Sequence, residues 1–170
     1  MRLLYYAITI ILFIGCTNNY KPDYSNGFVE LKINENSEKL EGRGVYITDN
    51  DFESVFYLKN KNGYDRMVIG FINIRTELGT YSLTNQAEYK EFSYGASLLT
   101  AAADGDVIED TYVLKSETNT ITVESYNDDT GTITGTFDIT FHINENYEKV
   151  NPSNPDIFTL KDAYFEVYLK

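Results

Sequence analysis

The residue with the clearest chemistry in this sequence is Cys16, the only cysteine of the chain. It follows Gly15 directly and ends an apolar segment, residues 3–14, that Arg2 precedes. A thiol is a good nucleophile once it is deprotonated, and a small preceding residue leaves room for an enzyme at the peptide bond. The apolar segment is shorter than the ~20 residues of a membrane-spanning helix, so it is typical of an export signal.

The run Leu12-Phe13-Ile14-Gly15-Cys16 resembles the lipobox of bacterial lipoproteins. The resemblance implies that the thiol of Cys16 takes a diacylglyceryl group and that the chain is cut before this residue. We therefore expect a signal peptide at residues 1–15, a lipidated cysteine with a flexible tether at residues 16–26, and a single domain at residues 27–170. An uncleaved membrane-tethering segment, or a plain secretory signal with a free cysteine, is the alternative. The expected location is the outer membrane, with its periplasmic and surface faces both open.

Carboxylates are the next candidates for chemistry, because the chain has 26 acidic residues and a formal net charge of −12. A glycosidase needs two acids about 5 to 9.5 Å apart. Acids in or beside predicted loops include Asp104, Asp106, Glu109, Asp110, Asp128 and Asp129. Such pairs arise by chance in so acidic a chain, so a glycan hydrolase is the least favoured function and we expect no enzyme. The acidity also argues against a nucleic-acid partner, because phosphates attract basic proteins.

Other catalytic, metal and cofactor sites find little support in the sequence. His142 is the only histidine, which argues against a catalytic triad and against a site with several histidines. The segments Asp49-Asn50-Asp51 and Asp104-Gly105-Asp106 lack the spacing of a calcium loop, and Gly42-Arg43-Gly44 lacks the further glycine of a nucleotide site. We therefore expect no catalytic residue, metal ligand or cofactor.

The elements that must position these groups have the alternation of β-strands. Val29, Leu31 and Ile33 alternate with Glu30 and Lys32, the two-residue period of a half-buried strand. The same period recurs at residues 45–47, 54–58, 67–74, 80–83, 112–114, 120–125, 132–143 and 163–169. This pattern predicts an all-β fold, an antiparallel β-sandwich built from meanders, with an open or closed lipocalin-like β-barrel as the alternative. Residues 96–103 are expected to form a helical turn or a loop across one end of the sheet.

The most regular local pattern lies at residues 130–143. Here Asp129-Thr130-Gly131 predicts a hairpin turn, and Gly135 predicts a bulge where another backbone comes close. The residues expected on the buried face are Phe137, Ile139, Phe141 and Ile143, and those expected outside are Thr136, Asp138, Thr140 and His142.

The run Gly131-Thr132-Ile133-Thr134-Gly135-Thr136-Phe137, with the earlier Gly79-Thr80-Tyr81, resembles small uncharacterised all-β lipoproteins of Bacteroidota. The resemblance covers roughly residues 28–143. It implies an exported β-domain and supplies no activity. The chain departs from the family pattern after His142, where residues 144–156 replace a short glycine-containing turn.

Tyrosines give the remaining signal for function. Tyr89, Tyr94 and Tyr126 lie in or beside predicted loops, where a ring can stack on a sugar or fill a pocket of a partner. We favour a non-catalytic envelope module that binds a protein or a glycan, which predicts an exposed tyrosine patch at one end of the fold. The alternative is a carrier of a small apolar ligand, which requires an open barrel interior.

Overall fold

The computed structural model describes residues 27–48, 51–60, 62–63, 65–85, 94–105, 107–115 and 118–169. Within these ranges the regular elements are all strands, and no helix is present that is long and apolar enough to cross a membrane. The predicted all-β class is therefore confirmed. In chain order the strands are β1 (Gly27–Ile33), β2 (Asn36–Thr48), β3 (Asp51–Lys59), β4 (Asp65–Arg75), β5 (Gly79–Ser82), β6 (Thr84–Asn85), β7 (Gly95–Ala101), β8 (Ile108–Leu114), β9 (Thr120–Asn127), β10 (Thr132–Ile143) and β11 (Ile157–Tyr168).

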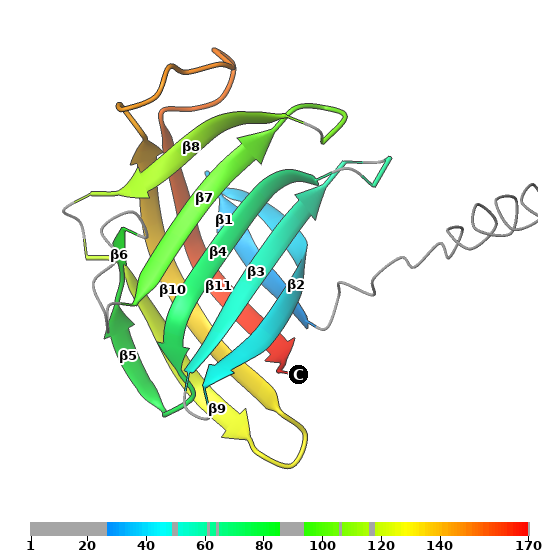
Figure 1. The fold of residues 1–170 in the computed structure, drawn as a ribbon, viewed down its shortest axis with the longest axis vertical. Helices are drawn as coiled ribbons and strands as arrows, with labels where there is room; N and C mark the ends of the chain where they lie inside the picture. The colour runs from blue at the N-terminus through cyan, green and yellow to red at the C-terminus, as the bar shows by residue number, and fades with distance from the viewer. Residues whose placement is uncertain are drawn as a thin grey trace, which may run out of the picture.

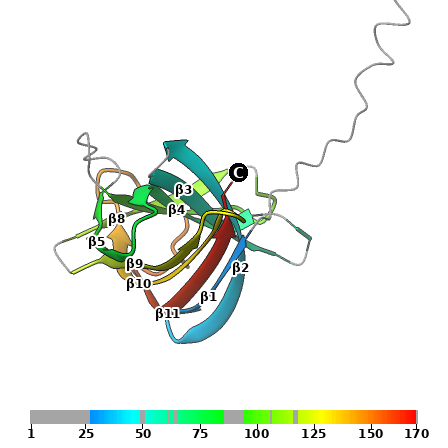
Figure 2. The same cartoon turned by 90° about the horizontal axis from the view of Figure 1, so that it is seen from below.

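Eight of these strands close into an antiparallel barrel (Figures 1 and 2). Their order around the barrel is β1-β2-β3-β4-β7-β8-β10-β11, and β11 pairs back with β1. The expected sandwich is therefore wrong, and the alternative barrel is confirmed. Both architectures give each strand the same inside-outside alternation. They differ in the pairing of the first strand with the last, which no local pattern encodes.

Strand β10 is the branch point of the sheet. One of its edges pairs with β11. The other pairs with β9 along residues 132–138 and with β8 along residues 141–143. Strand β5 extends this branch by pairing with β9, and β6 pairs in parallel with the start of β7. Strands β5, β6 and β9 lie outside the ring of eight; in Figure 1, β5 and β6 are at the left and β9 is at the bottom.

Four phenylalanine rings meet inside the barrel and form what we call the phenylalanine cluster. Phe56 lies 6.1 Å from Phe71, which lies 4.9 Å from Phe137, measured between ring centroids. Phe165 closes the cycle at 6.4 Å from Phe137 and 6.3 Å from Phe56. All four are buried, three of them with no exposed surface at all. The interior of an eight-stranded barrel either is filled by side chains or holds one small ligand. Here rings from β3, β4, β10 and β11 meet within it.

Two glycines make room for this cluster. A Cβ atom at Gly42 would lie 2.6 Å from Cδ1 and Cε1 of Phe56, and one at Gly135 would lie 2.7 Å from Cε1 and Cζ of Phe165. At Gly135 the added atom would also meet the backbone oxygen of Thr122, and the pairing of β10 with β9 shifts register there. The bulge and close backbone contact predicted at Gly135 are confirmed.

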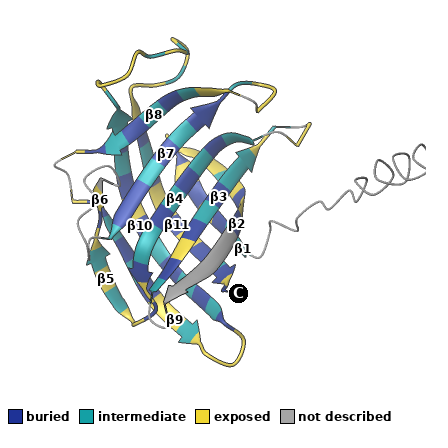
Figure 3. Cartoon of the chain, in the orientation of Figure 1, coloured by how far each residue is buried: buried dark blue, intermediate teal, exposed yellow. Residues whose placement is uncertain are grey.

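The predicted strand faces largely agree with the burial seen in Figure 3. In β1, Val29, Leu31 and Ile33 are buried, and Glu30 and Lys32 are exposed. In β10, Phe137, Ile139 and Phe141 are buried and Asp138 is exposed. The side chains of intermediate exposure are Thr136, Thr140, His142 and Ile143. The helical turn or loop expected at residues 96–103 is wrong, because residues 95–101 form β7. Small residues there have weak strand preference, and pairing with β4 and β8 overrides it.

The two ends of the barrel carry different features. At the end we call the loop end lie the β1–β2 turn and residues 144–156, which connect β10 to β11. Asn34 and Glu35 form that turn with φ of 46° and 73°, the positive values that a two-residue hairpin of this type requires. At the opposite end, the Gly27 end, Gly27 pairs with Val167, near the finish of β11. The predicted hairpin turn at residues 129–131 lies at the Gly27 end and is confirmed.

Candidate functional site

The candidate site lies at the loop end, where residues 144–156 cross the first half of β8. This segment, which we call the β10–β11 loop, is closed at its base by the N–H of Ile143 donating to Asp156 O at 2.8 Å. The N–H of Asn144 donates to Thr111 O of β8 at 2.9 Å. The loop is therefore pinned to the β8 edge beyond the point where β10 stops pairing with it.

Asp110 holds the middle of the loop. It is 2% exposed, and its Oδ1 accepts the N–H of Val150 at 2.8 Å. Its Oδ2 accepts Nδ2 of Asn154 at 2.7 Å. A buried carboxylate needs such donors, because leaving it without them is costly. Asp110, which sequence reasoning placed among possible catalytic acids, is thus fully engaged in fixing the loop backbone.

A polar network extends from this carboxylate to both neighbouring strands. Asn154 Nδ2 also lies 3.0 Å from Thr100 Oγ1 of β7. Glu109 Oε2 accepts Nδ2 of Asn151 at 2.9 Å. Within the loop, the N–H of Ser153 donates to Asn151 Oδ1 at 3.0 Å. Asparagines suit these positions because their side chains hydrogen-bond nearby backbone in turns.

Tyr112 anchors the end of the loop. Its hydroxyl donates to Pro155 O at 2.9 Å, and its ring packs edge-on against Phe158 with centroids 4.9 Å apart. Burial raises the pKa of the Tyr112 hydroxyl well above its ordinary value, and the carboxylates of Asp110, Asp156 and Glu109 raise it further. The hydroxyl therefore remains a donor to the loop over the whole physiological range of pH.

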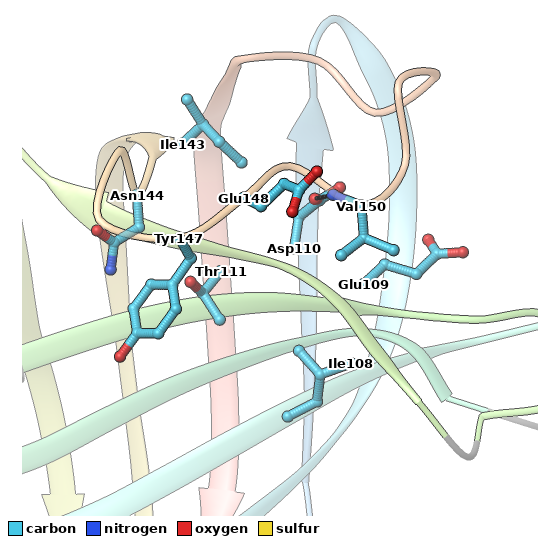
Figure 4. Close-up of a pocket in the computed structure, with 9 residues that line it drawn as sticks. All are labelled: Ile108, Glu109, Asp110, Thr111, Ile143, Asn144, Tyr147, Glu148 and Val150. Atoms are coloured by element: carbon cyan, nitrogen blue, oxygen red, sulfur yellow. Dashed lines mark hydrogen bonds between the residues drawn. The ribbon is translucent and has the colours of Figure 1, made fainter.

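Between loop and strand lies a pocket of about 310 Å³, which we call the loop pocket (Figure 4). Ile108 and Tyr147 are 56% and 67% exposed at its rim, and Val150 is 61% exposed. Single exposed apolar side chains are common, but several of them around one pocket are typical of a binding surface. The lining residues are Ile108, Glu109, Asp110, Thr111, Ile143, Asn144, Tyr147, Glu148 and Val150.

Some charged side chains around the loop pocket form salt bridges and others do not. Lys149 Nζ lies 2.6 Å from Asp156 Oδ1, and Lys115 Nζ lies 2.8 Å from Glu145 Oε1. Within the described ranges, Glu109 and Glu148 form no salt bridge. In the same ranges, Thr111 Oγ1 is buried and makes no hydrogen bond. The loop pocket therefore combines an apolar rim with carboxylates that no lysine or arginine of the described chain neutralises.

A second hollow lies on the outer wall over β1, β2 and β11, and we call it the wall groove. Its volume is about 470 Å³, and its lining includes Glu30, Lys39, Lys32, Asp162 and Tyr164. Most charges here are paired: Lys39 Nζ lies 2.7 Å from Glu30 Oε1, and Lys32 Nζ lies 2.6 Å from Asp162 Oδ2. Glu38, which also lines the groove, forms no salt bridge within the described ranges. The wall groove is larger, but both of its lysines are already paired with its own carboxylates, so the loop pocket is the better candidate.

The structure places Tyr94 and Tyr126, two of the three tyrosines singled out in the sequence, away from this pocket. Tyr94 packs against the core, with its ring 4.8 Å from that of Tyr81. Tyr126 also packs against the core, and its hydroxyl lies 3.1 Å from Asp128 Oδ1. Tyr89 and Cys16 lie outside the described residues. Sequence reasoning missed Tyr147, the exposed tyrosine at the pocket rim.

The acids considered for catalysis divide between the two ends of the barrel. Asp128 and Asp129 lie in the turn before β10, at the Gly27 end, whereas Glu109 and Asp110 line the loop pocket. Asp104 lies in the β7–β8 turn, and Asp106 is outside the described residues. His142 is half-buried on β10, paired with Val113 and Ile157. The described chain contains no group of three or more His, Cys, Asp or Glu side chains suited to a metal ion.

Fold and site together define an antiparallel β-barrel with a cluster of phenylalanine rings inside it and a pocket under one long end loop. Comparison of the chain with protein-family models, with curated proteins and with solved structures found no match.

Proposed function

We propose that this protein is a non-catalytic lipoprotein of the cell envelope, a binding module that presents its loop pocket away from the membrane. The observation that carries the proposal is the position of the loop pocket relative to the start of β1. Gly27 pairs with Val167 at one end of the barrel, and Ile33 pairs with Leu160, close to the loop, at the other. A lipid carried by Cys16 would therefore hold the barrel by the end opposite the pocket.

The length of the tether limits the distance between the barrel and the membrane. Residues 16–26 separate the lipid attachment site from β1, and even a fully extended segment of this length spans no more than about 40 Å. Two or three acyl chains give nearly permanent attachment, at about 0.8 kcal/mol for each buried methylene. The barrel would then stay close to the membrane, and its attachment at the Gly27 end favours a loop end that faces outward, where a partner on another molecule can reach Tyr147 and Val150.

The alternative role, a carrier of a small apolar molecule, draws less support. A carrier needs space inside the barrel for its cargo. The phenylalanine cluster occupies the middle of the interior with four buried rings in mutual contact. A glycan hydrolase is also less supported, because Asp110, the most buried acid at the loop pocket, uses both carboxylate oxygens to hold the loop.

Two measurements test the proposal. Growth with radiolabelled palmitate should label the wild-type protein and leave Cys16→Ala unlabelled; equal labelling would end the lipoprotein claim. A photoreactive phenylalanine analogue in place of Tyr147 should then give a discrete cross-linked product in intact cells. The same analogue in place of Tyr164, in the wall groove, is the matched control. Identical products from the two positions, or none from either, would contradict a binding role for the loop pocket.

A further inference from the structure

We infer that the loop pocket receives an arginine side chain of a partner protein. The inference rests on the proposed binding role and names the chemistry that the pocket recognises. It follows from three properties of the pocket: an exposed apolar rim, carboxylates without a cationic partner, and a volume suited to a single side chain.

The apolar rim matches the hydrocarbon part of an arginine. Ile108 and Val150 are both more than half exposed and lie on opposite sides of the pocket, one on β8 and one on the loop (Figure 4). Long basic side chains bury their methylene stems along such apolar surfaces while the charged head stays at a polar group. The ring of Tyr147 is 67% exposed, and a guanidinium is attracted electrostatically to the face of an aromatic ring.

The carboxylates supply the charge that a guanidinium requires. Asp110 is committed to the N–H of Val150 and to Asn154, which leaves Glu148 and the second oxygen of Glu109. The nearby lysines already form salt bridges, Lys149 with Asp156 and Lys115 with Glu145. Arginine presents a planar set of donors that binds carboxylates through two hydrogen bonds, whereas lysine acts as a point charge. The formal net charge of −12 would also attract a basic partner from a distance.

The size of the pocket argues for a side chain instead of a larger ligand. About 310 Å³ is at the lower limit of pockets that hold small molecules. Val107, next to the pocket on the β7–β8 connection, is 57% exposed and would continue the contact beyond it. Arginine is among the residues that dominate protein interfaces when seated in a pocket surrounded by such contacts.

The test uses the full chain in nonionic detergent, with methyl groups labelled for NMR, and N-acetyl-arginine N-methylamide as the probe. Adding it should shift the methyl signals of Ile108 and Val150. The citrulline analogue, equal in shape but neutral, and the lysine analogue should each bind about two- to fivefold more weakly, the range of exposed charge pairs. Only the binding of the charged probes should weaken with added salt.

Substitutions in the loop pocket test whether the arginine probe binds there. Glu148→Gln and Tyr147→Ala should each weaken arginine binding about two- to fivefold. Glu30→Gln in the wall groove is the matched control and should leave binding unchanged. Equal affinity for arginine and citrulline, or equal effects of Glu148→Gln and Glu30→Gln, would overturn the inference. If the arginine probe does not bind but the photoreactive residue at position 147 still gives its specific cross-link, the binding role stands and the ligand class is wrong. If the probe does not bind and no specific cross-link forms, the proposed function is wrong as well.

Discussion

The Asp110→Asn substitution tests the idea that one buried carboxylate holds the β10–β11 loop over its pocket. The carboxylate accepts the N–H of Val150 at 2.8 Å and Nδ2 of Asn154 at 2.7 Å through different oxygens. An amide of the same shape has one oxygen, so it keeps one of these bonds and turns an N–H group toward the other donor. Losing a hydrogen bond to a charged group costs about 1.5 to 3 kcal/mol. We therefore expect the equilibrium between open and closed loop to shift toward opening by roughly 10- to 150-fold.

Amide hydrogen exchange measures this opening directly. The reporters are the N–H groups of Tyr147 and Asn154, which bond within the loop to Asn144 O and Asn151 O and make no bond to Asp110. Their exchange should accelerate by the factor above, while amides of the barrel strands change little. Asp129→Asn removes one negative charge from an exposed turn at the Gly27 end and serves as the control. If both variants leave loop exchange at the wild-type rate, Asp110 does not hold the loop and the argument fails.

Three further predictions concern the stability of the barrel. Because the pKa of Tyr112 is raised in the folded chain, the unfolded chain loses the hydroxyl proton near pH 10 while the folded chain keeps it. The free energy of unfolding should therefore fall above pH 10 by about 1.4 kcal/mol per pH unit. Tyr112→Phe should remove this part of the slope in denaturant titrations; an unchanged slope would refute the assignment. Glu35→Gly should raise the unfolding free energy by about 0.5 to 1 kcal/mol, since Glu35 has a φ of 73°, and a decrease would count against the strain. Gly135→Ala should cost about 1 to 3 kcal/mol in the same assay, more than Gly70→Ala, whose added Cβ meets only Ser97 Oγ at 3.1 Å; equal costs would refute the close packing.

The strands were largely predictable because burial imposes a two-residue period on the sequence. Val29, Leu31 and Ile33 show the period clearly, and so do the residues of β10. Strand β7 was missed because its glycine, alanine and serine residues have weak strand preference, and only its neighbours β4 and β8 make it a strand. The barrel could not be separated from a sandwich, because closure depends on the contact of β1 with β11 at the far end of the chain.

The candidate site was harder to predict than the fold because its parts are distant in the sequence. Asp110 and Val150 form one hydrogen bond across 40 positions of the chain. Neither residue alone differs from the many acids and apolar residues of an acidic β-protein. A usable signal was present in residues 144–156, where Tyr147 and Val150 are apolar side chains in an otherwise polar, proline-containing segment. In a segment without periodicity, such residues have no strand face to bury them, which makes exposure at a loop the expected outcome.

The same buried carboxylate links the stability of the loop to its proposed role. A site that takes a partner side chain must keep its rim in place before the partner arrives, because ordering a loop on binding lowers affinity. Asp110, Tyr112 and the asparagine network fix the loop from β8 and β7, and they leave the side chains of Tyr147, Glu148 and Val150 exposed. Asp110→Asn should therefore weaken binding of the arginine probe even though Asp110 offers it no free oxygen. A variant with a looser loop but unchanged probe affinity would separate the two roles and place recognition elsewhere on the barrel.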